Sequence, residues 1–293
     1  MMMDKVLFLT DSACDLPESD AQEYGIKVLP VPITVDGKGY LERVDFTPRE
    51  FYELLGKSVG IPTTAHITHL TYLEEYQTAA AQGYEAIVLV TISSTGSAMK
   101  DAATLARELF YEENPDKASL EIHIVDSLNY TMSYGYPLMQ AVKQVRAGAS
   151  AKEAAAYLED YFTRVEILFT PYTLEYAKKS GRIGVAAAFV GEVLGLKPVI
   201  SIIDGKMNIE DKVRGDKAVI PRTVELVKQR KAEADSPYLL VHGSRDGVGD
   251  ELAEALTKEL GFPPTGIYYI GACIAINSGP EVVGVAFLGK KRR

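Results

Sequence analysis

Short apolar runs recur along the first half of the chain, and segments of helical length lie among them. Apolar runs of this length, bounded by polar turns, predict buried strands. Their alternation with helices is typical of an α/β fold with a parallel sheet. The expected strands cover residues 4–10, 26–35, 85–92 and 121–126, and the expected helices cover about 48–57, a segment ending near Gly83, 97–113 and 130–147.

Two of the helix starts carry a capping box. Thr47-Pro48-Arg49-Glu50 combines an N-cap hydroxyl with a glutamate three residues later and a proline at the first helical position. Ser150-Ala151-Lys152-Glu153 repeats the hydroxyl and the glutamate ahead of AAAYLEDYF, which has helical periodicity. We place a domain boundary at this second helix, which gives an N-terminal α/β domain of residues 1–150 and a C-terminal domain of residues 151–293.

Beyond this boundary, hairpin signals mix with helix signals. Asp204-Gly205 stands between two apolar runs in LKPVISIIDGKMNIED and predicts a β-hairpin. We therefore expect an α+β second domain. Its other strands are expected near 165–170, 238–243, 266–271 and 282–288, and its helices near 173–179, 185–194, 216–234 and 247–260.

Composition narrows the class of function. The 293 residues include 31 Lys and Arg against 40 Asp and Glu, a net charge of −9, which argues against non-specific binding to nucleic acid or anionic membranes. The basic cluster KKRR at 290–293 is interpreted as a solvated tail. Cys14 and Cys273 form no disulfide framework and no zinc motif. With no export signal and no membrane-spanning run, the sequence favours a cytoplasmic protein.

Three loops at the ends of predicted strands or ahead of helices are dense in hydroxyl side chains. They are LTDSACD at 9–15, IPTTAHIT at 61–68 and TISSTGSAMK at 91–100. Ligands of open α/β sheets lie where strands end and helices begin, and hydroxyls and free N–H groups there suit an anion. Ser, Thr and Asp are also ordinary helix N-caps, so a structural role for each loop stays open.

Other chemistries suggested by these loops lack part of their residue set. Asp11 and Asp15 invite a phospho-aspartate or magnesium site, but no basic residue or further carboxylate stands in their loop, which favours turn and capping roles. His66 and His69 are spaced for one helix face without a nominated third metal ligand, so no metal site is expected. Walker and G-x-G-x-x-G motifs are absent.

A serine acyl-enzyme is the sharpest enzymatic alternative. Ser97-Ala98-Met99-Lys100 is S-x-x-K, and SLN at 127–129 and KSG at 179–181 resemble the partner motifs of penicillin-binding proteins and class A β-lactamases. The lysine would take the proton of the attacking serine. However, LEYAKKSGRI predicts a helix that ends at Gly181. In penicillin-binding proteins and class A β-lactamases, the motif that KSG resembles lies on a strand beside the nucleophile. We therefore disfavour this alternative.

Segments spread over nearly the whole chain resemble, in order, the motifs of the DegV family, whose members are fatty-acid-binding acyl carriers of bacterial fatty-acid kinase. LTDSACDL is similar to T-D-S-x-x-D-L, PTTAHI lies where the family has T-S-Q-P, and SSTGSAMKDAA is similar to S-S-x-L-S-G-T-Y-x-x-A. IVDS is similar to V-I-D-S. KKSGRI followed by LKPVISIIDGKM resembles K-G-G-R-I and L-x-I-K-P-I-x-x-x-x-D-G, and INSGPEVVGV resembles H-x-G-x-G-x-x-G-x.

The resemblance implies a two-domain DegV-like α/β fold, with an N-terminal Rossmann-like parallel sheet flanked by helices and a C-terminal α+β domain. It also implies one long-chain fatty acid, with its tail in an apolar tunnel and its carboxylate near the domain interface. The carboxylate contacts carry over to Thr63, with Thr64 beside it, to Ser97, and to Asn277, which replaces a histidine in the last loop. The kinase-docking arginine of the family falls on Arg214.

Elementary energetics agrees with such a ligand. A buried carboxylate needs several donors, and hydroxyls supply them without a second buried charge. Burial of a tail of about sixteen carbons gains on the order of 10 kcal/mol before ordering losses. The resemblance, together with the absence of nucleotide motifs, implies no catalytic activity and no cofactor, and the net charge of −9 argues against a nucleic-acid partner.

The expected role is to carry a long-chain fatty acid, present it to a fatty-acid kinase catalytic subunit for acyl-phosphate formation, and contact membranes transiently for lipid exchange. The alternative from another class is a phosphotransferase related to dihydroxyacetone-kinase domains. That alternative predicts a phosphorylated intermediate on His66, His69 or Asp11.

Overall fold

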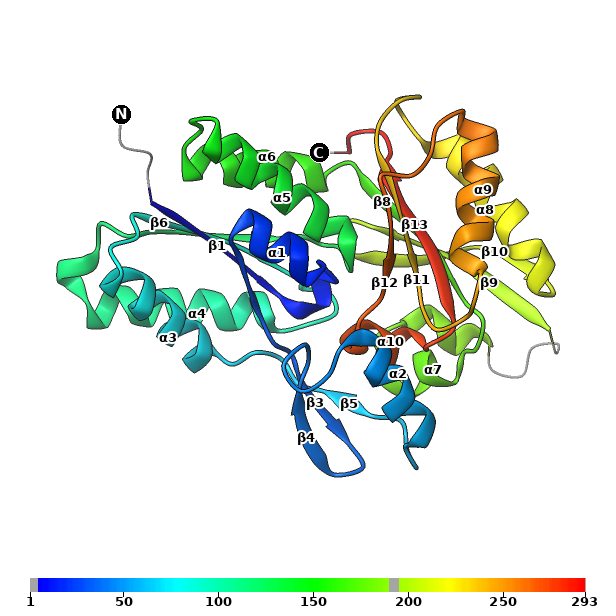
Figure 1. The fold of residues 1–293 in the computed structure, drawn as a ribbon, viewed down its shortest axis with the longest axis horizontal. Helices are drawn as coiled ribbons and strands as arrows, with labels where there is room; N and C mark the ends of the chain where they lie inside the picture. The colour runs from blue at the N-terminus through cyan, green and yellow to red at the C-terminus, as the bar shows by residue number, and fades with distance from the viewer. Residues whose placement is uncertain (1–4, 190–194, 293) are drawn as a thin grey trace.

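The computed structural model describes residues 5–189 and 195–292, and its strands form two large sheets and a small one (Figure 1). The first sheet is parallel, in the order β2 (Ile26–Leu29), β1 (Val6–Asp11), β6 (Ala86–Thr91), β7 (Glu121–Asp126). The second has the order β10 (Lys206–Arg214), β9 (Leu196–Ile203), β8 (Val165–Pro171), β13 (Val282–Leu288), β11 (Tyr238–His242), β12 (Gly266–Tyr269). The small sheet has the order β4 (Lys38–Leu41), β3 (Pro32–Val35), β5 (Thr63–Thr64).

Helices cover both faces of the first sheet, so the predicted parallel sheet with flanking helices is confirmed. One face carries α1 (Glu18–Tyr24), α5 (Met132–Arg146) and α6 (Ala151–Phe162), and the other carries α3 (His69–Ala81) and α4 (Met99–Glu113) (Figure 1). Because α6 packs against β6 and β7, the chain passes to the second sheet only after Phe162. The domain division at residue 150 stays a prediction.

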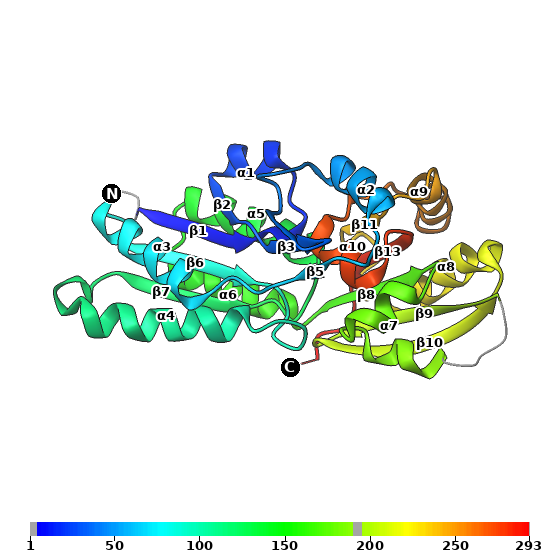
Figure 2. The ribbon, with the colours of Figure 1, turned by 90° about the horizontal axis from the view of Figure 1, so that it is seen from below.

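The second sheet is covered by helices on its outer side and by the first half of the chain on its inner side. The outer helices are α8 (Val219–Arg230) and α9 (Val248–Leu260), and α2 (Pro48–Lys57), α7 (Glu175–Ser180) and α10 (Ala272–Ser278) gather beside the small sheet (Figure 1). Seen from below, the two large sheets lie side by side along the long axis, with β3, β5 and α10 between them (Figure 2). The expected α+β second half is confirmed.

The burial of β8 shows why both faces of this sheet are covered. All seven of its residues are buried, and successive side chains on a strand point to opposite faces. Leu168 packs in a core with the outer helices, whereas Ile167 and Phe169 belong to the core that continues into the first half of the chain. The two halves therefore share one continuous apolar interior.

Several local signals are confirmed. The side chains of Thr47 and Ser150 each accept a hydrogen bond from the backbone N–H of the glutamate three residues later. The side chain of that glutamate accepts one from the backbone N–H of the capping residue, so both capping boxes form. Asp204 and Gly205 have φ values of 49° and 73°, as expected for the two central residues of a tight hairpin turn.

Three expectations need correction. Residues 26–35 form two strands in different sheets: Pro30, which lacks an N–H, lies in the break between them, and Pro32 is the first residue of the second strand. Asn277, expected in a loop, lies in α10. Of the α-helix expected over 185–194, residues 185–189 belong to a 3-10 helix, Gly184–Phe189, and residues 190–194 lie outside the described residues.

A buried carboxylate joins the ends of the two central strands of the first sheet. Asp11, at the end of β1, accepts hydrogen bonds from the N–H of Ile92 at 2.8 Å, the hydroxyl of Tyr134 at 2.7 Å and the N–H of Ala13 at 3.2 Å. The chain turns to opposite sides of the sheet at β1 and β6, where ligands of such sheets bind. Asp11 therefore fixes the start of the loop that carries Ser97, in the capping role predicted for it.

Asp11 gives the stability of the protein a distinctive pH dependence. Burial raises the pKa of Asp11 to about 6, against the opposing effect of its hydrogen bonds. The folded state thus binds this proton more tightly than the unfolded chain, so the contribution of Asp11 to the free energy of unfolding is largest at acid pH and falls as pH rises towards 6. Urea unfolding measures the free energy of unfolding of wild type and of Asp11→Asn. The value for wild type minus the value for the variant should be more positive at pH 4.5 than at pH 7.5, by on the order of 2 kcal/mol. An equal difference at both pH values would contradict this assignment.

Candidate functional site

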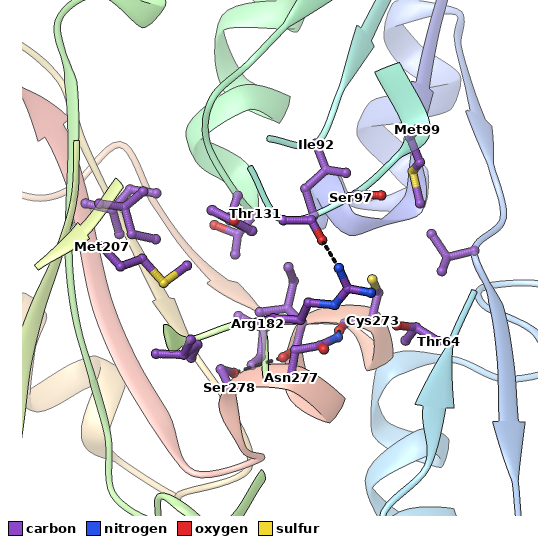
Figure 3. Close-up of a pocket in the computed structure, with 18 of the residues that line it drawn as sticks. Thr64, Ile92, Ser97, Met99, Thr131, Arg182, Met207, Cys273, Asn277 and Ser278 are labelled. Carbon is purple, nitrogen blue, oxygen red and sulfur yellow. Dashed lines mark hydrogen bonds between the residues drawn. The ribbon is translucent and has the colours of Figure 1, made fainter. Parts of the chain in front are cut away.

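A cavity of about 230 Å³ lies where the strand ends of the first sheet meet α10 and the inner face of the second sheet (Figure 3). Its walls come from both halves of the chain, so neither half encloses it alone. Most of the lining is apolar and includes Val31, Ile92, Met99, Ile167, Phe169, Ile202, Met207, Val241, Ile270, Ile274 and Val282.

Polar side chains gather at one side of the cavity. Figure 3 shows Ser97, Arg182, Asn277 and Thr64 around a common space, with Met207 on the opposite side. Three of the four residues that the sequence nominates for a carboxylate therefore line one cavity, although they are far apart in the chain.

The small sheet decides which of the two adjacent threonines faces the cavity. In the β3–β5 ladder Thr64 is opposite Ile33 and Thr63 is opposite Thr34. Ile33 is buried whereas Thr34 is exposed, and paired residues share a face of the sheet. Thr64 consequently lines the cavity, and Thr63 is exposed and is not among the lining residues.

The loop that carries Ser97 is held by backbone contacts. The N–H of Ser93 donates to the carbonyl of Asn129 at 3.0 Å, and the N–H of Ser97 donates to the carbonyl of Ser93 at 3.1 Å. Helix α4 begins one residue after Ala98, which caps it without a side-chain hydrogen bond. Capping, the competing explanation for this loop, therefore does not involve the hydroxyl of Ser97.

The hydroxyl groups at the polar side have unused hydrogen-bonding capacity. Within residues 5–189 and 195–292, the side chains of Thr64 and Ser97 form no hydrogen bond with protein atoms. By contrast, Thr68, in the same predicted hydroxyl-rich loop as Thr64, caps α3 by accepting from the N–H of Thr71. The two cavity hydroxyls are thus available to a ligand.

Arg182 is a cavity residue that sequence reasoning did not nominate. It follows Gly181, which ends α7 with φ 67°, and its Nη1 donates to the carbonyl of Gly96 at 3.0 Å (Figure 3). A guanidinium beside two free hydroxyls suits an anionic group. The segment KKSGRI was available as a signal, but its pattern does not show that this side chain turns towards Ser97 rather than into solvent.

Asn277 reaches the cavity from α10, whose start is held by two acidic residues. Nδ2 of Asn277 donates to the carbonyl of Cys273 at 2.7 Å. Asp15 accepts from the N–H of Gly271 at 2.7 Å, and Glu42 accepts from the N–H of Cys273 at 2.9 Å. Burial, reinforced by the charge of Glu42, raises the pKa of Asp15 well above its usual value, and burial also raises that of Glu42.

The residues of the alternative chemistries lie in other arrangements. Lys100 forms an ion pair with Asp126 at 3.5 Å, and the KSG segment ends helix α7 as expected, which does not fit an acyl-enzyme. His66 lines the cavity, whereas His69 is the first residue of α3. No group of three or more His, Cys, Asp or Glu in the described part of the chain is arranged to hold a metal ion.

Arg214, nominated for partner docking, is exposed at the end of β10. It is not among the residues that line the cavity. None of the helices in residues 5–189 and 195–292 combines the length and apolarity needed to cross a bilayer.

The fold and the cavity define an α/β protein with two large sheets, a small third sheet and a mostly apolar interior cavity bordered by polar groups. The model of the family described as "Uncharacterised protein, DegV family" matches residues 5–290. A DegV domain-containing protein of Clostridium perfringens is 30% identical over 283 residues, which cover 96% of this chain and 98% of the relative. The chain belongs to the DegV family.

Solved structures agree with this assignment. A stearic-acid-binding protein from Eubacterium ventriosum superposes with a TM-score of 0.86 at 25% identity and covers 99% of each chain. A DegV family protein from Thermus thermophilus, described by its fatty-acid binding, gives a TM-score of 0.84 at 24% identity and covers 98% of this chain and 100% of its own. The second comparison supports the fold alone.

The two cysteines should be unreactive in the folded protein. Both are buried and free, and burial raises the pKa of Cys14 and of Cys273 far above the usual range, so little reactive thiolate forms. With a chromogenic disulfide reagent at pH 8, each should react at least about 100-fold more slowly than free cysteine. Both should react quickly in urea, and rapid labelling of native Cys273 would show that this cavity residue is a reactive thiol.

Proposed function

We propose that this protein binds one long-chain fatty acid, with the acyl tail in the apolar cavity and the carboxylate at its polar side. The observation that carries the proposal is the pair of unused hydroxyls, Thr64 and Ser97, beside the guanidinium of Arg182 in a mostly apolar cavity. The name of the Eubacterium ventriosum protein, which binds stearic acid, supports the same ligand class.

The polar side supplies what a carboxylate requires. Hydroxyl and guanidinium donors form charge-assisted hydrogen bonds with carboxylate oxygens. The net charge of the chain is −9, so a local cation offsets repulsion of an anionic ligand. Asn277 adds an amide that, unlike the histidine of related sequences, does not change charge near neutral pH.

The position of the polar side suits a carrier. Arg182 is exposed although it lines the cavity, so a carboxylate held there stays within reach of a second protein. We infer that the protein has no catalytic activity of its own and presents the fatty acid to a fatty-acid kinase catalytic subunit, with the exposed Arg214 as the docking cation. Lipid would be exchanged through transient membrane contact in the cytoplasm.

The ligand class is tested by native mass spectrometry. The protein expressed in bacteria should carry a single adduct of fatty-acid mass, and delipidated protein should take up one equivalent of palmitate or oleate. The dicarboxylate succinate, which lacks the apolar tail, should not bind. A clean ligand-free mass with no uptake would contradict the proposal, and phosphate on His66, His69 or Asp11 after incubation with a phosphate donor would favour the phosphotransferase alternative.

Thr64 and Thr63 provide a matched pair of variants. Thr64→Val removes the cavity hydroxyl without changing the shape of the side chain, and should weaken oleate binding roughly 10-fold because a charge-assisted hydrogen bond is lost. Thr63→Val removes the neighbouring exposed hydroxyl and should leave binding unchanged. Ser97→Ala should resemble Thr64→Val. Isothermal titration calorimetry measures the Kd for oleate of each variant. A larger loss of affinity in Thr63→Val than in Thr64→Val would assign the contact to the other face of β5.

A further inference from the structure

The C-terminal tail is bound to the protein surface, in contrast to the solvated tail expected from its charges. After β13, the N–H of Gly289 donates to the carbonyl of Arg164 at 2.8 Å, and the N–H of Arg292 donates to the carbonyl of Thr163 at 3.3 Å. Lys291 pairs with Asp160. The tail therefore continues beyond β13 alongside Thr163 and Arg164, the residues that precede β8.

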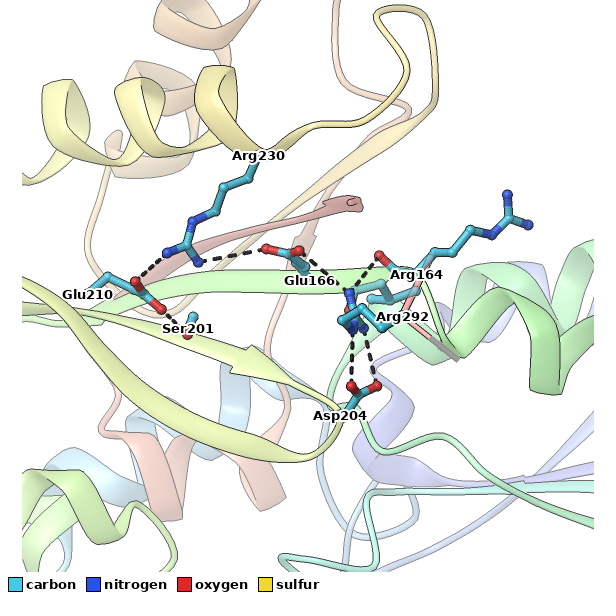
Figure 4. A network of polar contacts seen from close by, with 8 residues as sticks. Arg164, Glu166, Ser201, Asp204, Glu210, Arg230 and Arg292 are labelled. Atoms are coloured by element: carbon cyan, nitrogen blue, oxygen red, sulfur yellow. Dashed lines mark hydrogen bonds and ion pairs between the residues drawn. The ribbon is translucent and has the colours of Figure 1, made fainter. Parts of the chain in front are cut away.

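Arg292 connects this tail to the turn of the β9–β10 hairpin (Figure 4). Its Nε donates to Asp204 Oδ2 at 3.1 Å and its Nη2 to Asp204 Oδ1 at 3.4 Å, a two-pronged contact. Nη2 also donates to the carbonyl of Val165 at 2.9 Å, and Nη1 lies 3.5 Å from Glu166. With 20% of its side chain exposed, this guanidinium is more ordered and less screened than an ordinary surface cation.

The same turn rests on the loop that carries Ser97. The hydroxyl of Thr95 donates to the carbonyl of Gly205 at 2.7 Å. The approach is close, because a Cβ at Gly205 would lie 2.7 Å from Cγ2 of Thr95. The turn thus joins the second half of the chain to the β6–α4 loop of the first half.

This junction lies beside the ligand cavity. Ile202 and Met207, on either side of the turn, line the cavity, as do Gly96 and Ser97 in the loop. Among the described residues, the hydrogen bonds between residues 93–97 and the second half are the Thr95–Gly205 and Arg182–Gly96 contacts. A separation of turn and loop would therefore open the cavity wall along its side.

We propose that Arg292 is a positioning residue that holds the hairpin turn, through Asp204, against Thr95, and thereby sets the rate at which the ligand enters and leaves. This inference rests on the proposed fatty-acid binding. Neither Arg292 nor Thr95 lines the cavity. Substitution of either side chain therefore weakens the closure of the cavity wall and leaves the residues that line the cavity unchanged.

The kinetic signature follows from this arrangement. A contact that closes the wall in both the free and the bound protein slows association and dissociation equally. Arg292→Ala should therefore raise both rate constants for cis-parinarate, a fluorescent polyene fatty acid, roughly 10-fold, with less than about a threefold change in Kd. A general loss of stability would instead weaken binding. Stopped-flow fluorescence measures both rates.

Thr95→Val gives an independent variant, because it removes the hydroxyl that bonds the carbonyl of Gly205, together with its contact to the hydroxyl of Ser93 within the loop. It should reproduce the faster exchange, and the double variant with Arg292→Ala should be no faster than either single variant, since both changes release the same turn. Additive effects on the rates would overturn the inference. Arg230→Ala is the matched control, because Arg230 pairs with Glu210 and Glu166 in the same network without reaching Asp204 (Figure 4), and should leave both rates unchanged.

Hydrogen exchange of the ligand-free protein separates this inference from the proposed function. Arg292→Ala should speed amide exchange both at the turn, residues 203–206, and in the loop, residues 93–97. Unchanged exchange in the loop would overturn the inference whatever the ligand. If cis-parinarate does not bind at all, the proposed function fails, and faster exchange in both segments still establishes the contact between tail, turn and loop.

Discussion

The inner face of the second sheet is apolar, and this face must be covered for the chain to fold. Ile167, Phe169 and Val241 point from it towards the first half of the chain, which supplies the strand ends of the first sheet and α10 as cover. Apolar surface is stabilised in proportion to the area removed from water. Where the two halves do not meet completely, an apolar space remains that polar groups border on one side. The site is thus a consequence of how two sheets pack, and neither half contains it.

The electrostatics of α10 explain why a cation belongs at this border. The carboxyl groups of Asp15 and Glu42 already accept hydrogen bonds from N–H groups at the start of the helix, where an anion would otherwise be favoured. Asn277 lies near its C-terminal end, where the helix dipole disfavours negative charge. An anionic head group beside Asn277 therefore depends on donors from other elements, and the guanidinium of Arg182 and the hydroxyls of Thr64 and Ser97 are of the required kind.

Local signals predicted those parts of the fold that local interactions decide. The capping boxes at Thr47 and Ser150 and the Asp-Gly hairpin depend on a few neighbouring residues, and they formed as expected. The direction of Arg182 and the place of the C-terminal tail depend on residues tens to hundreds of positions away, which no local pattern encodes. Of the residues that the family resemblance nominated, Thr64, Ser97 and Asn277 line the cavity, but whether Thr63 or Thr64 faces inward depended on pairing with β3. Whether these residues bind the carboxylate stays a prediction.

A carrier of long-chain lipid must reconcile tight retention with release. Each buried methylene contributes about 0.8 kcal/mol, so an enclosed acyl tail is held strongly by area alone, without a need for many polar contacts. Exchange of the lipid then requires the cavity walls to separate. The free-energy cost of this opening depends on the contacts between the walls. Hydrogen bonds across the junction of turn and loop are individually worth only about 1 kcal/mol, so their loss removes little of the stability that the shared apolar interior provides. Placing these contacts outside the cavity lets the rate of exchange be adjusted independently of the head-group contacts. Arg292 is positioned for that adjustment, because it binds the turn through Asp204 while Thr95 binds it through Gly205, and neither residue lines the cavity.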